Sequence, residues 1–377
     1  WMYAHAAAAA AASGKNVRVT LAAQEGDSED TTGSLAELRL LPPYALFEIS
    51  LAEEPRLKNS AIISLISEKL NRWPSSNIQE LCITGRANGV AYAHIAAEAV
   101  RRGVERIYCW TPTDGSVLIY DRRQSSQIDP ETFPDWLLNF LDPPKCPVVV
   151  GVLGDPNCGK SVLSLALNHY RRQLGIRGWR LDCDGASPTP DWYLSSLETN
   201  PEEAKEKRRA IKRPWTEAME DQIAKRLHRL RDFFDIAIAD LPGGDHSKSP
   251  PERVPKHREV ILKEVDAFIL LERVDRPTIA EWENELRNHG LSERIVAKLG
   301  STAPEAEPCL SIQLDDSGVW CGQVSGLDRQ KRPEHLVQGL KSGFQMMWPS
   351  LLKTMSAAGD ASSVGGEEAA IPSRGRG

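Results

Sequence analysis

The sequence has no excess of positive charge, no long apolar run and no internal repeat, and each absence excludes a class of protein. Its 46 lysines and arginines stand against 52 aspartates and glutamates, a net charge of −6, so no overall positive field favours long nucleic acid or anionic lipid. No apolar segment approaches the ~20 residues that a membrane-spanning helix needs, and no solenoid repeat is visible. We therefore expect a soluble protein that binds neither long nucleic acid nor a membrane.

The cysteines are too few and too scattered to form a covalent or metal framework. There are seven, an odd number, and no C-x-x-C pair occurs, which argues against a disulfide set and against a structural zinc site. A reducing, cytoplasmic environment fits this usage best. The 27 glycines and 25 prolines are close to average usage, so the composition is not that of a disordered or collagen-like chain.

A chain of 377 residues predicts two or three domains at about 150 residues each, and a proline pair marks one boundary. Pro143 and Pro144 separate two regions in which strand-like and helix-like segments alternate, and proline forces the residue before it out of helical geometry. The end of the chain lacks the apolar periodicity that offsets the entropy of ordering. We expect a disordered leader (1–16), a first domain (17–125), a linker (126–146), a second domain (147–355) and a disordered tail (356–377).

The alternation of elements predicts the α/β fold class for both regions. In the first region we expect strands at 45–49, 81–84, 106–110 and 116–120, and helices at 61–73 and 90–102. In the second we expect strands at 148–153, 179–182, 235–239, 267–271 and 309–312, and helices at 161–174 and around 219–230. The apolar strands of the second region are typical of a parallel sheet that is covered on both faces.

The segment GDPNCGKS, residues 154–161, fits the phosphate-binding pattern G-x-x-x-x-G-K-[ST]. It follows one expected strand and opens an expected helix, which is the context that this pattern requires. Lys160 is expected to bridge the outer phosphates and the Ser161 hydroxyl to bind Mg²⁺, while backbone amides wrap the phosphates. A chance match in a glycine turn is the alternative. The ATP site is predicted to use Gly154, Asp155, Pro156, Asn157, Cys158, Gly159, Lys160 and Ser161.

Such a site needs a carboxylate from a neighbouring strand, and Asp240 ends the apolar segment FDIAIAD. It is expected to hold Mg²⁺ or its water. Gly243 and Gly244 then allow a backbone amide to approach the terminal phosphate, although they also fit a simple turn. Asp184 follows another expected strand and is a candidate to orient a water or to hold the ion through one; a turn aspartate that caps its own backbone is the alternative.

The basic run KEKRRAIKR, residues 205–213, is a second candidate for phosphate contact. It is basic enough to place an arginine on the nucleotide or across an interface, and a solvated helix face is the alternative. In the first region, Gly85 and Arg86 follow a strand and precede a helix. A glycine turn with an arginine beside it holds a phosphodiester by backbone and guanidinium together, or is simply a turn with a surface arginine.

Taken together, these motifs resemble two families. The second region, with its strand, loop and helix, the Asp-x-Asp-Gly turn and ADLPGGD, resembles P-loop ATPases of the signal-recognition and partitioning class. With ITGRANGVAYAHIAAEAV and VERIYCWTPTDGSVLIY added, most of the chain resembles the ring nucleases of type III CRISPR systems that are fused to a C-terminal P-loop ATPase domain. The resemblance implies a small Rossmann-like α/β domain followed by a P-loop NTPase domain with a mainly parallel sheet.

The resemblance also implies a ligand and candidate residues. Members of this family pair to bind cyclic tetra-adenylate, a small RNA ring, and cleave it with Mn²⁺, which switches off antiviral signalling. Gly85 and Arg86 match the family's Gly-Arg turn and are expected to contact the ligand phosphates. The family's histidine and aspartate have no counterpart at their places in this sequence; His94 on the same expected helix and Asp114 in the next turn are candidates to replace them as ligand or base.

We therefore expect cyclic tetra-adenylate binding and phosphodiester cleavage coupled to a Mg²⁺-dependent ATPase, in a homodimer or larger homo-oligomer, because two copies of one pocket match a four-fold ring better than one. Two alternatives stay open. In one, the first domain senses the ring without cleaving it and regulates the ATPase. In the other, the second domain is a P-loop kinase of a small molecule, and the run 205–213 is its lid.

Overall fold

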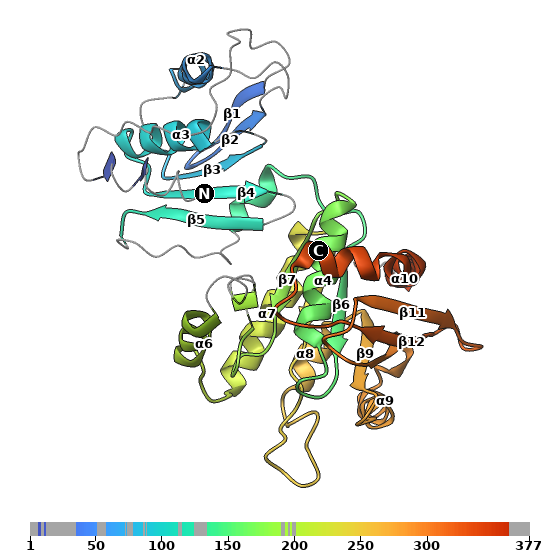
Figure 1. Cartoon of the computed structure of the whole chain (residues 1–377). Helices are drawn as coiled ribbons and strands as arrows, with labels where there is room; N and C mark the ends of the chain where they lie inside the picture. The colour runs from blue at the N-terminus through green and yellow to red at the C-terminus, as the bar shows by residue number, and fades with distance from the viewer. Residues whose placement is uncertain are drawn as a thin grey trace, which may run out of the picture. The chain divides into compact units, whose positions relative to one another are not determined.

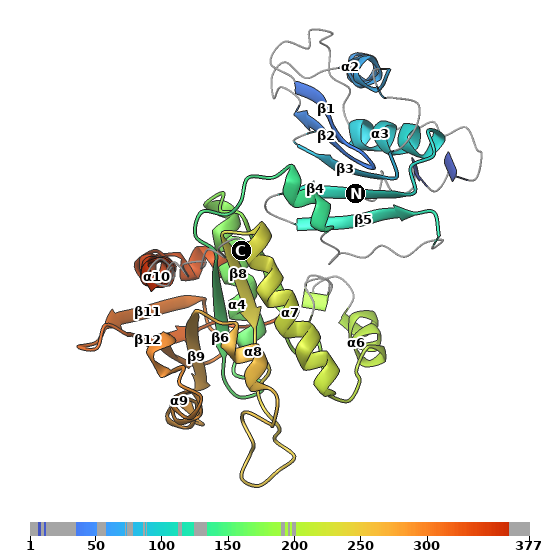
Figure 2. The ribbon, with the colours of Figure 1, turned by 180° about the vertical axis from the view of Figure 1, so that it is seen from behind.

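The computed structural model describes residues 7–8, 11–12, 35–50, 58–71, 73, 78–85, 87, 89–111, 115–123, 134–189, 193–194, 197 and 201–361, with side chains up to 352 in the last helix. The chain divides into two compact units, Trp1–Pro143 and Pro144–Gly377. The division falls between the two prolines that the sequence marks as a boundary. Each unit is built on its own sheet of parallel and antiparallel strands, against which helices pack (Figures 1 and 2).

The first unit contains a five-stranded sheet in the order β1-β2-β3-β4-β5. Its strands are β1 (Leu35–Leu41), β2 (Tyr44–Ser50), β3 (Glu80–Thr84), β4 (Arg106–Thr111) and β5 (Gly115–Asp121). The central pairs β2–β3 and β3–β4 are parallel, and the outer pairs β1–β2 and β4–β5 are antiparallel. Four of these strands lie where the sequence predicts them; β1 was missed.

Two helices, α2 (Asn59–Leu70) and α3 (Gly89–Arg101), pack on one face of this sheet. Their buried residues meet the alternate strand positions that point the same way, as in the cluster of Phe47, Ile83 and Ile95. The opposite face receives the short helix η1 (Asp135–Asn139), whose Trp136 stacks on Tyr44.

Two segments that were expected to lie outside the folded domains, a linker and a disordered leader, contribute to this unit. The indole N–H of Trp136, in the expected linker, donates to Glu80 at 2.8 Å and is buried. In the expected leader, the four described alanines are helical, and Ala7 packs on Ala93 and Ala97 of α3. Alanine carries no amphipathic pattern, so the sequence held no signal for this contact.

The second unit contains a seven-stranded sheet in the order β11-β12-β10-β9-β6-β8-β7. Its strands are β6 (Val148–Leu153), β7 (Gly178–Asp182), β8 (Ile236–Asp240), β9 (Ala267–Arg273), β10 (Ile295–Ser301), β11 (Cys309–Leu314) and β12 (Trp320–Ser325). All pairs are parallel except β11–β12. The expected strand at 309–312 is therefore present, but its parallel direction was wrong, because the short turn at 315–318 folds β11 back on β12 as a hairpin.

Helices cover both faces of this sheet. The helices α4 (Lys160–Gln173) and α10 (Pro333–Ala361) share one core with the face formed by residues such as Val150, Ile238 and Ile269. The opposite face packs against α7 (Glu217–Phe233), α8 (Glu259–Lys263) and α9 (Ile279–Asn288), as the two opposite views show (Figures 1 and 2). The helix α6 (Pro201–Ala210) and the 3-10 turn η2 (Ser292–Arg294) complete the unit. The helix α10 runs past residue 356, where the tail was expected to begin.

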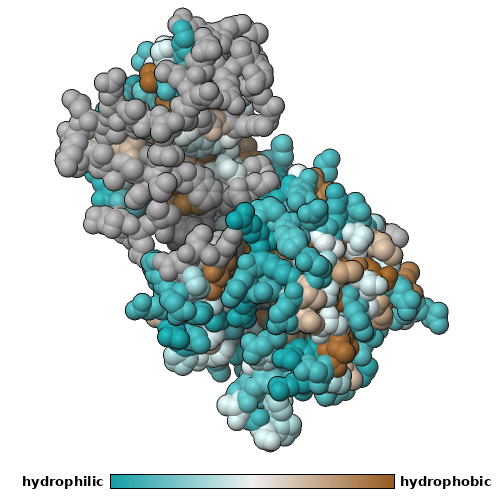
Figure 3. All heavy atoms as spheres, in the orientation of Figure 1, coloured by the Kyte–Doolittle hydropathy of each residue, from teal (hydrophilic) through white to brown (hydrophobic). Residues whose placement is uncertain are grey.

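The visible surface of the second unit is mostly hydrophilic, with single hydrophobic residues scattered over it (Figure 3). Among the described residues, no helix is both long enough and apolar enough to cross a membrane.

Candidate functional site

The loop of residues 154–161 lies between β6 and α4, at the edge where the parallel strands end. Its first glycine is pressed against β9: a Cβ on Gly154 would lie 1.9 Å from the carbonyl oxygen of Leu271. Gly159 adopts φ +102, and a Cβ there would lie 2.7 Å from Leu327. Both positions therefore require glycine, because a side chain would displace either a neighbouring strand or the turn after β12. These two contacts hold the loop against β9 and against the turn after β12.

The lysine of the loop is folded over the loop backbone. Lys160 Nζ donates to the carbonyl oxygen of Asp155 at 2.9 Å, and Asn157 adopts the left-handed φ of 65°. The ammonium is only half-buried, so it stays available to an anion that enters the loop. Cys158 is 2% exposed, and burial raises the pKa of its thiol.

A cavity of about 270 Å³ opens beside this loop. The register of the sheet explains which residues meet there: β8 is the direct neighbour of β6, and Val152 pairs with Asp240. This space is the smaller of two described cavities at the loop, and the predicted residues that line it are Pro156, Asn157, Gly159, Lys160, Ser161, Asp184, Asp240, Gly243 and Gly244. Strand ends, loop and glycine turn thus converge on one space, as the motifs predict.

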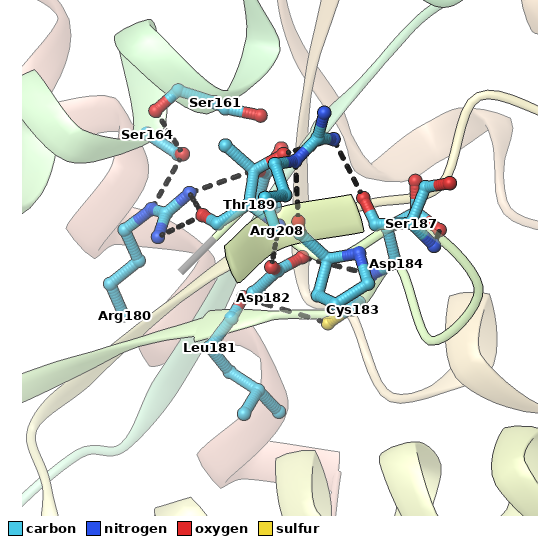
Figure 4. Close-up of polar contacts among 12 residues, drawn as sticks. Ser161, Ser164, Arg180, Leu181, Asp182, Cys183, Asp184, Ser187, Thr189 and Arg208 are labelled. Atoms are coloured by element: carbon cyan, nitrogen blue, oxygen red, sulfur yellow. Dashed lines mark hydrogen bonds and ion pairs between the residues drawn. The ribbon is translucent and has the colours of Figure 1, made fainter. Parts of the chain in front are cut away.

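The carboxylate of Asp240 is held by a buried arginine that the sequence analysis missed. Arg180, on β7, donates from Nη2 to Asp240 Oδ2 at 2.8 Å, and both side chains are at most 4% exposed. Arg180 Nε also donates to Ser164 Oγ at 2.8 Å, and Ser164 in turn donates to the carbonyl oxygen of Ser161 (Figure 4). One carboxylate oxygen of Asp240 is therefore committed to the protein, and the guanidinium ties the end of β8 to the first turn of α4.

Two more aspartates end β7 and shape the adjoining loop. Asp182 accepts the backbone N–H groups of Asp184 and Thr189 (Figure 4), and burial, with the neighbouring charge of Asp240, raises its pKa against the opposing effect of Arg180. Asp184 Oδ1 accepts the N–H groups of Ala186 at 3.2 Å and Ser187 at 2.9 Å. Asp184 thus caps its own turn, which was the alternative interpretation of this residue, and also lines the smaller cavity.

The basic run 205–213 spans the end of α6 and contributes to the far wall of the smaller cavity. Arg208 donates to the carbonyl oxygens of Pro188 at 2.8 Å and Ser187 at 2.9 Å, and stacks over Tyr193 at 5.0 Å. Lys205 and Lys207 form exposed ion pairs along the helix, which is the solvated-face alternative. The run is therefore divided: Arg208 and Lys212 line this cavity, Lys205 lines the larger cavity beside it, and Lys207 and Arg209 are exposed.

Asp155 was predicted to bind the nucleotide, but its carboxylate is engaged by other parts of the unit. Arg253 donates to both of its oxygens, at 3.2 and 3.3 Å, and the indole N–H of Trp282 donates to Oδ1 at 2.8 Å. Asp155 is not among the described residues that line the smaller cavity. Its side chain instead links the loop to the segment after Gly244 and to α9, while its carbonyl oxygen holds Lys160.

A second, larger cavity of about 880 Å³ adjoins the same loop. Asn157, Gly159, Val162 and Arg329 line both cavities. The wall of the larger one comes from the segments that follow β10 and β12, including Thr302. It is more apolar than the smaller cavity and is large enough for a nucleoside.

The residues at the smaller cavity fit a Mg²⁺ ion. The Ser161 hydroxyl and the remaining oxygen of Asp240 are the hard oxygen donors that Mg²⁺ takes beside phosphate oxygens and water. No cluster of three or more histidine, cysteine or acidic side chains that could hold a metal occurs among the described residues. Any Mg²⁺ would thus share its coordination with the bound phosphates, as P-loop sites do.

In the first unit, Gly85 is the described part of the expected ligand turn. It adopts φ +106, and a Cβ would lie 2.1 Å from the carbonyl oxygen of Ile49. The hydroxyl of Tyr92, which the sequence analysis missed, donates to the Gly85 carbonyl oxygen at 2.7 Å. Arg86 and Asp114, the other two candidates at this edge, lie outside the described residues.

His94 lies on α3, but its described polar partner is on α2. Its Nε2 is 3.3 Å from Ser67 Oγ, and burial lowers its pKa more than Glu98 raises it. The structure therefore places this imidazole in the contact between the two helices α2 and α3.

No family model matches the chain, and no match to it is found among curated proteins.

Proposed function

We propose that the second unit binds ATP with Mg²⁺ and hydrolyses it. One observation carries this proposal: the loop 154–161, Asp240 and the Gly243–Gly244 turn all line one cavity, although they come from separate parts of the chain. In this proposal the backbone amides of the loop and Lys160 bind the phosphates, and the larger cavity takes the nucleoside. Bound Mg²⁺ supplies neutralisation of the phosphate charge, held by Ser161 and Asp240.

Within this proposal, the protein's own groups orient the reaction. The guanidinium of Arg180 fixes the direction of the Asp240 carboxylate, and the turn at Gly243 and Gly244 offers backbone amides to the terminal phosphate. Gly243 has no room for a side chain, because a Cβ would lie 2.9 Å from Pro156 of the loop. This contact keeps the turn close to the phosphates.

We further propose that the first unit binds cyclic tetra-adenylate at the Gly85–Arg86 turn, that it cleaves the ring with Mn²⁺, and that the chain acts as a homodimer. The sequence resemblance supports this, as does the placement of Gly85 at the carboxyl end of the central strand β3. ATP turnover would then be coupled to the removal of an antiviral signal.

One observation favours the sensor alternative, in which the ring is bound without cleavage. The described candidate base, His94, has its Nε2 3.3 Å from Ser67 Oγ on α2, whereas the described hydrogen bond to the Gly85 carbonyl oxygen comes from the Tyr92 hydroxyl. Tyr92 positions the turn through this bond.

One observation favours the kinase alternative. The smaller cavity is also lined by Lys212 and Arg208, which suit an anionic acceptor, and by Asp184. In a kinase, Asp184 would take the proton of the acceptor hydroxyl while the terminal phosphoryl group passes to its oxygen.

The ATPase proposal is tested by ADP release from the purified full chain with ATP and Mg²⁺. Lys160→Ala is expected to lower turnover at least about hundredfold, because the outer phosphates lose their cation. Lys225→Ala is the matched control: Lys225 is exposed on α7 and lines neither cavity. Equal turnover in Lys160→Ala and Lys225→Ala would remove the ATPase assignment.

The first unit is tested with cyclic tetra-adenylate and Mn²⁺, with and without ATP. Ring opening that disappears in Arg86→Ala supports the nuclease. Tight binding of an intact ring supports the sensor. Absence of ring binding, together with transfer of the terminal phosphate to a small molecule, supports the kinase.

A further inference from the structure

The turn between β12 and α10 carries an arginine that no motif singles out. The turn is tight: Asp328 N donates to the Gly326 carbonyl oxygen at 2.8 Å, and Asp328 Oδ1 accepts the N–H of Gln330 at 2.9 Å. Gly326 adopts φ +74, and a Cβ there would lie 2.6 Å from the backbone of Pro308. Arg329 therefore projects from a defined backbone position rather than from a loose loop.

This turn is packed directly on the loop 154–161. Leu327 is 7% exposed, belongs to the same core cluster as α4, and leaves no room for a side chain at Gly159. Arg329 follows Leu327 by two residues, so the contact holds the arginine beside the loop.

Arg329 faces both cavities. It is one of the four residues that line the smaller and the larger cavity together. Within the described part of the chain, its half-buried guanidinium has no hydrogen bond and no ion pair. The other three shared residues, Asn157, Gly159 and Val162, belong to the loop and the start of α4, and they mark the place where a nucleotide would pass from one cavity into the other.

A guanidinium without a protein partner at this junction points to an anionic ligand. Guanidinium groups bind phosphate oxygens through two parallel N–H donors, and the gain is larger in a partly dehydrated cavity. Lys160, Arg208 and Lys212 line only the smaller cavity, and Lys205 and Arg273 line only the larger one. Arg329 alone among these cations reaches both spaces.

We propose that Arg329 binds the phosphate chain of the nucleotide at the junction of the two cavities, beside the loop, and stabilises the charge that develops during hydrolysis. This inference rests on the ATPase proposal. Water attacks the terminal phosphorus, the bond to the oxygen that bridges the last two phosphates breaks, and ADP, phosphate and a proton leave. Negative charge grows on that bridging oxygen and the phosphate of the leaving ADP, and Arg329 donates hydrogen bonds to it.

The test compares Arg329→Ala and Arg329→Lys with Arg287→Ala in the full chain. Arg287 is exposed on α9 and lines neither cavity, so its variant is expected to match the wild type. Arg329→Ala is expected to lower kcat about hundredfold with a smaller change in KM, and Arg329→Lys to lower it less. Added guanidinium ion at low millimolar concentration is expected to restore part of the kcat of Arg329→Ala only, which a merely structural residue would not allow.

The test distinguishes a failure of the ATPase proposal from a failure of the role proposed for Arg329. If the wild type neither binds nor hydrolyses ATP, the ATPase proposal fails. If the wild type is active and Arg329→Ala retains its kcat, or loses it together with its cooperative thermal unfolding and without guanidinium rescue, the role of Arg329 fails while the ATPase proposal stands.

Discussion

Both units end a central parallel strand on a glycine that touches the next strand, and the two edges differ in the side chains that surround this glycine. Gly85 ends β3 against the carbonyl oxygen of Ile49, and Gly154 ends β6 against that of Leu271. After Gly154 the chain places Lys160 and Ser161 in a cavity that Asp240 shares. After Gly85 the described contact is the Tyr92 hydroxyl on the glycine carbonyl oxygen.

The comparison shows that a glycine at a strand end lets two backbone segments approach closely, and that this approach alone does not make a binding site. The close approach is explained in both units by sheet packing alone. Among the described residues, the second unit differs in the charged side chains that neighbouring strands bring to this edge, above all the buried pair of Arg180 and Asp240. Three substitutions test this contrast. They remove the ion pair between Arg180 and Asp240, the space that Gly85 leaves for the Ile49 carbonyl oxygen, and the contact of His94 with α2.

The largest effect is expected for Arg180→Met. It leaves Asp240 buried without its cation, beside Asp182, so the free energy of unfolding of the second unit should fall by about 3–5 kcal/mol. Denaturant unfolding followed by circular dichroism measures this. Adding Asp240→Asn to Arg180→Met should recover part of the loss, because the orphaned charge is gone. A stability of Arg180→Met equal to the wild type would show that the pair does not support this edge.

A smaller effect is expected for Gly85→Ala. The added Cβ meets the Ile49 carbonyl oxygen and needs the left-handed φ, so the first unit should lose roughly 2–4 kcal/mol. Gly103→Ala is the matched control, since Gly103 has φ +87 but no atom within 4 Å of the added Cβ. Equal losses in the two variants would assign the whole effect to φ and leave none to the strand contact. ATP turnover by the second unit is measured in both variants, and unchanged turnover shows that the loss of stability is confined to the first unit.

The smallest effect is expected from His94. Because burial lowers its pKa, the unfolded chain takes up a proton near pH 6.5 that the folded first unit accepts only at lower pH. The stability of this unit should therefore fall as the pH decreases below about 6.5. His94→Gln should flatten this dependence, whereas His289→Gln, in the second unit, should not. A steeper dependence in His94→Gln would contradict the burial of the imidazole.

The sequence predicted the parts of the site that are encoded locally. The loop 154–161, the strand that ends at Asp240 and the following glycines each lie within a short segment whose pattern carries its own meaning. The α/β class followed in the same way, from alternating apolar segments. Four strand predictions failed: β1, β10 and β12 were not predicted, and β11 was given the wrong direction. β11 has one buried residue, Leu310, so its few apolar residues did not reveal its direction.

The sequence could not predict the partners of the site residues, because these partners come from distant parts of the chain. Arg180 is 60 residues from Asp240, Arg253 is 98 from Asp155, and Trp282 is 127 from Asp155. Only the sheet order β9-β6-β8-β7 brings such residues together. The partners of the Asp155 carboxylate belong to a contact that no spacing rule describes.

The contact between Asp155 and Trp282 gives the chain an optical reporter of its own. The indole N–H ends on the carboxylate of the second loop residue, and the guanidinium of Arg253 lies 5.9 Å from the centre of the same ring. Fluorescence of an indole responds to the charges and hydrogen bonds around it, so a ligand that moves the loop would shift the emission of Trp282. Because the chain has ten tryptophans, the difference between the emission of the wild type and that of Trp282→Phe isolates this signal and lets the occupancy of the loop be followed in solution without a label.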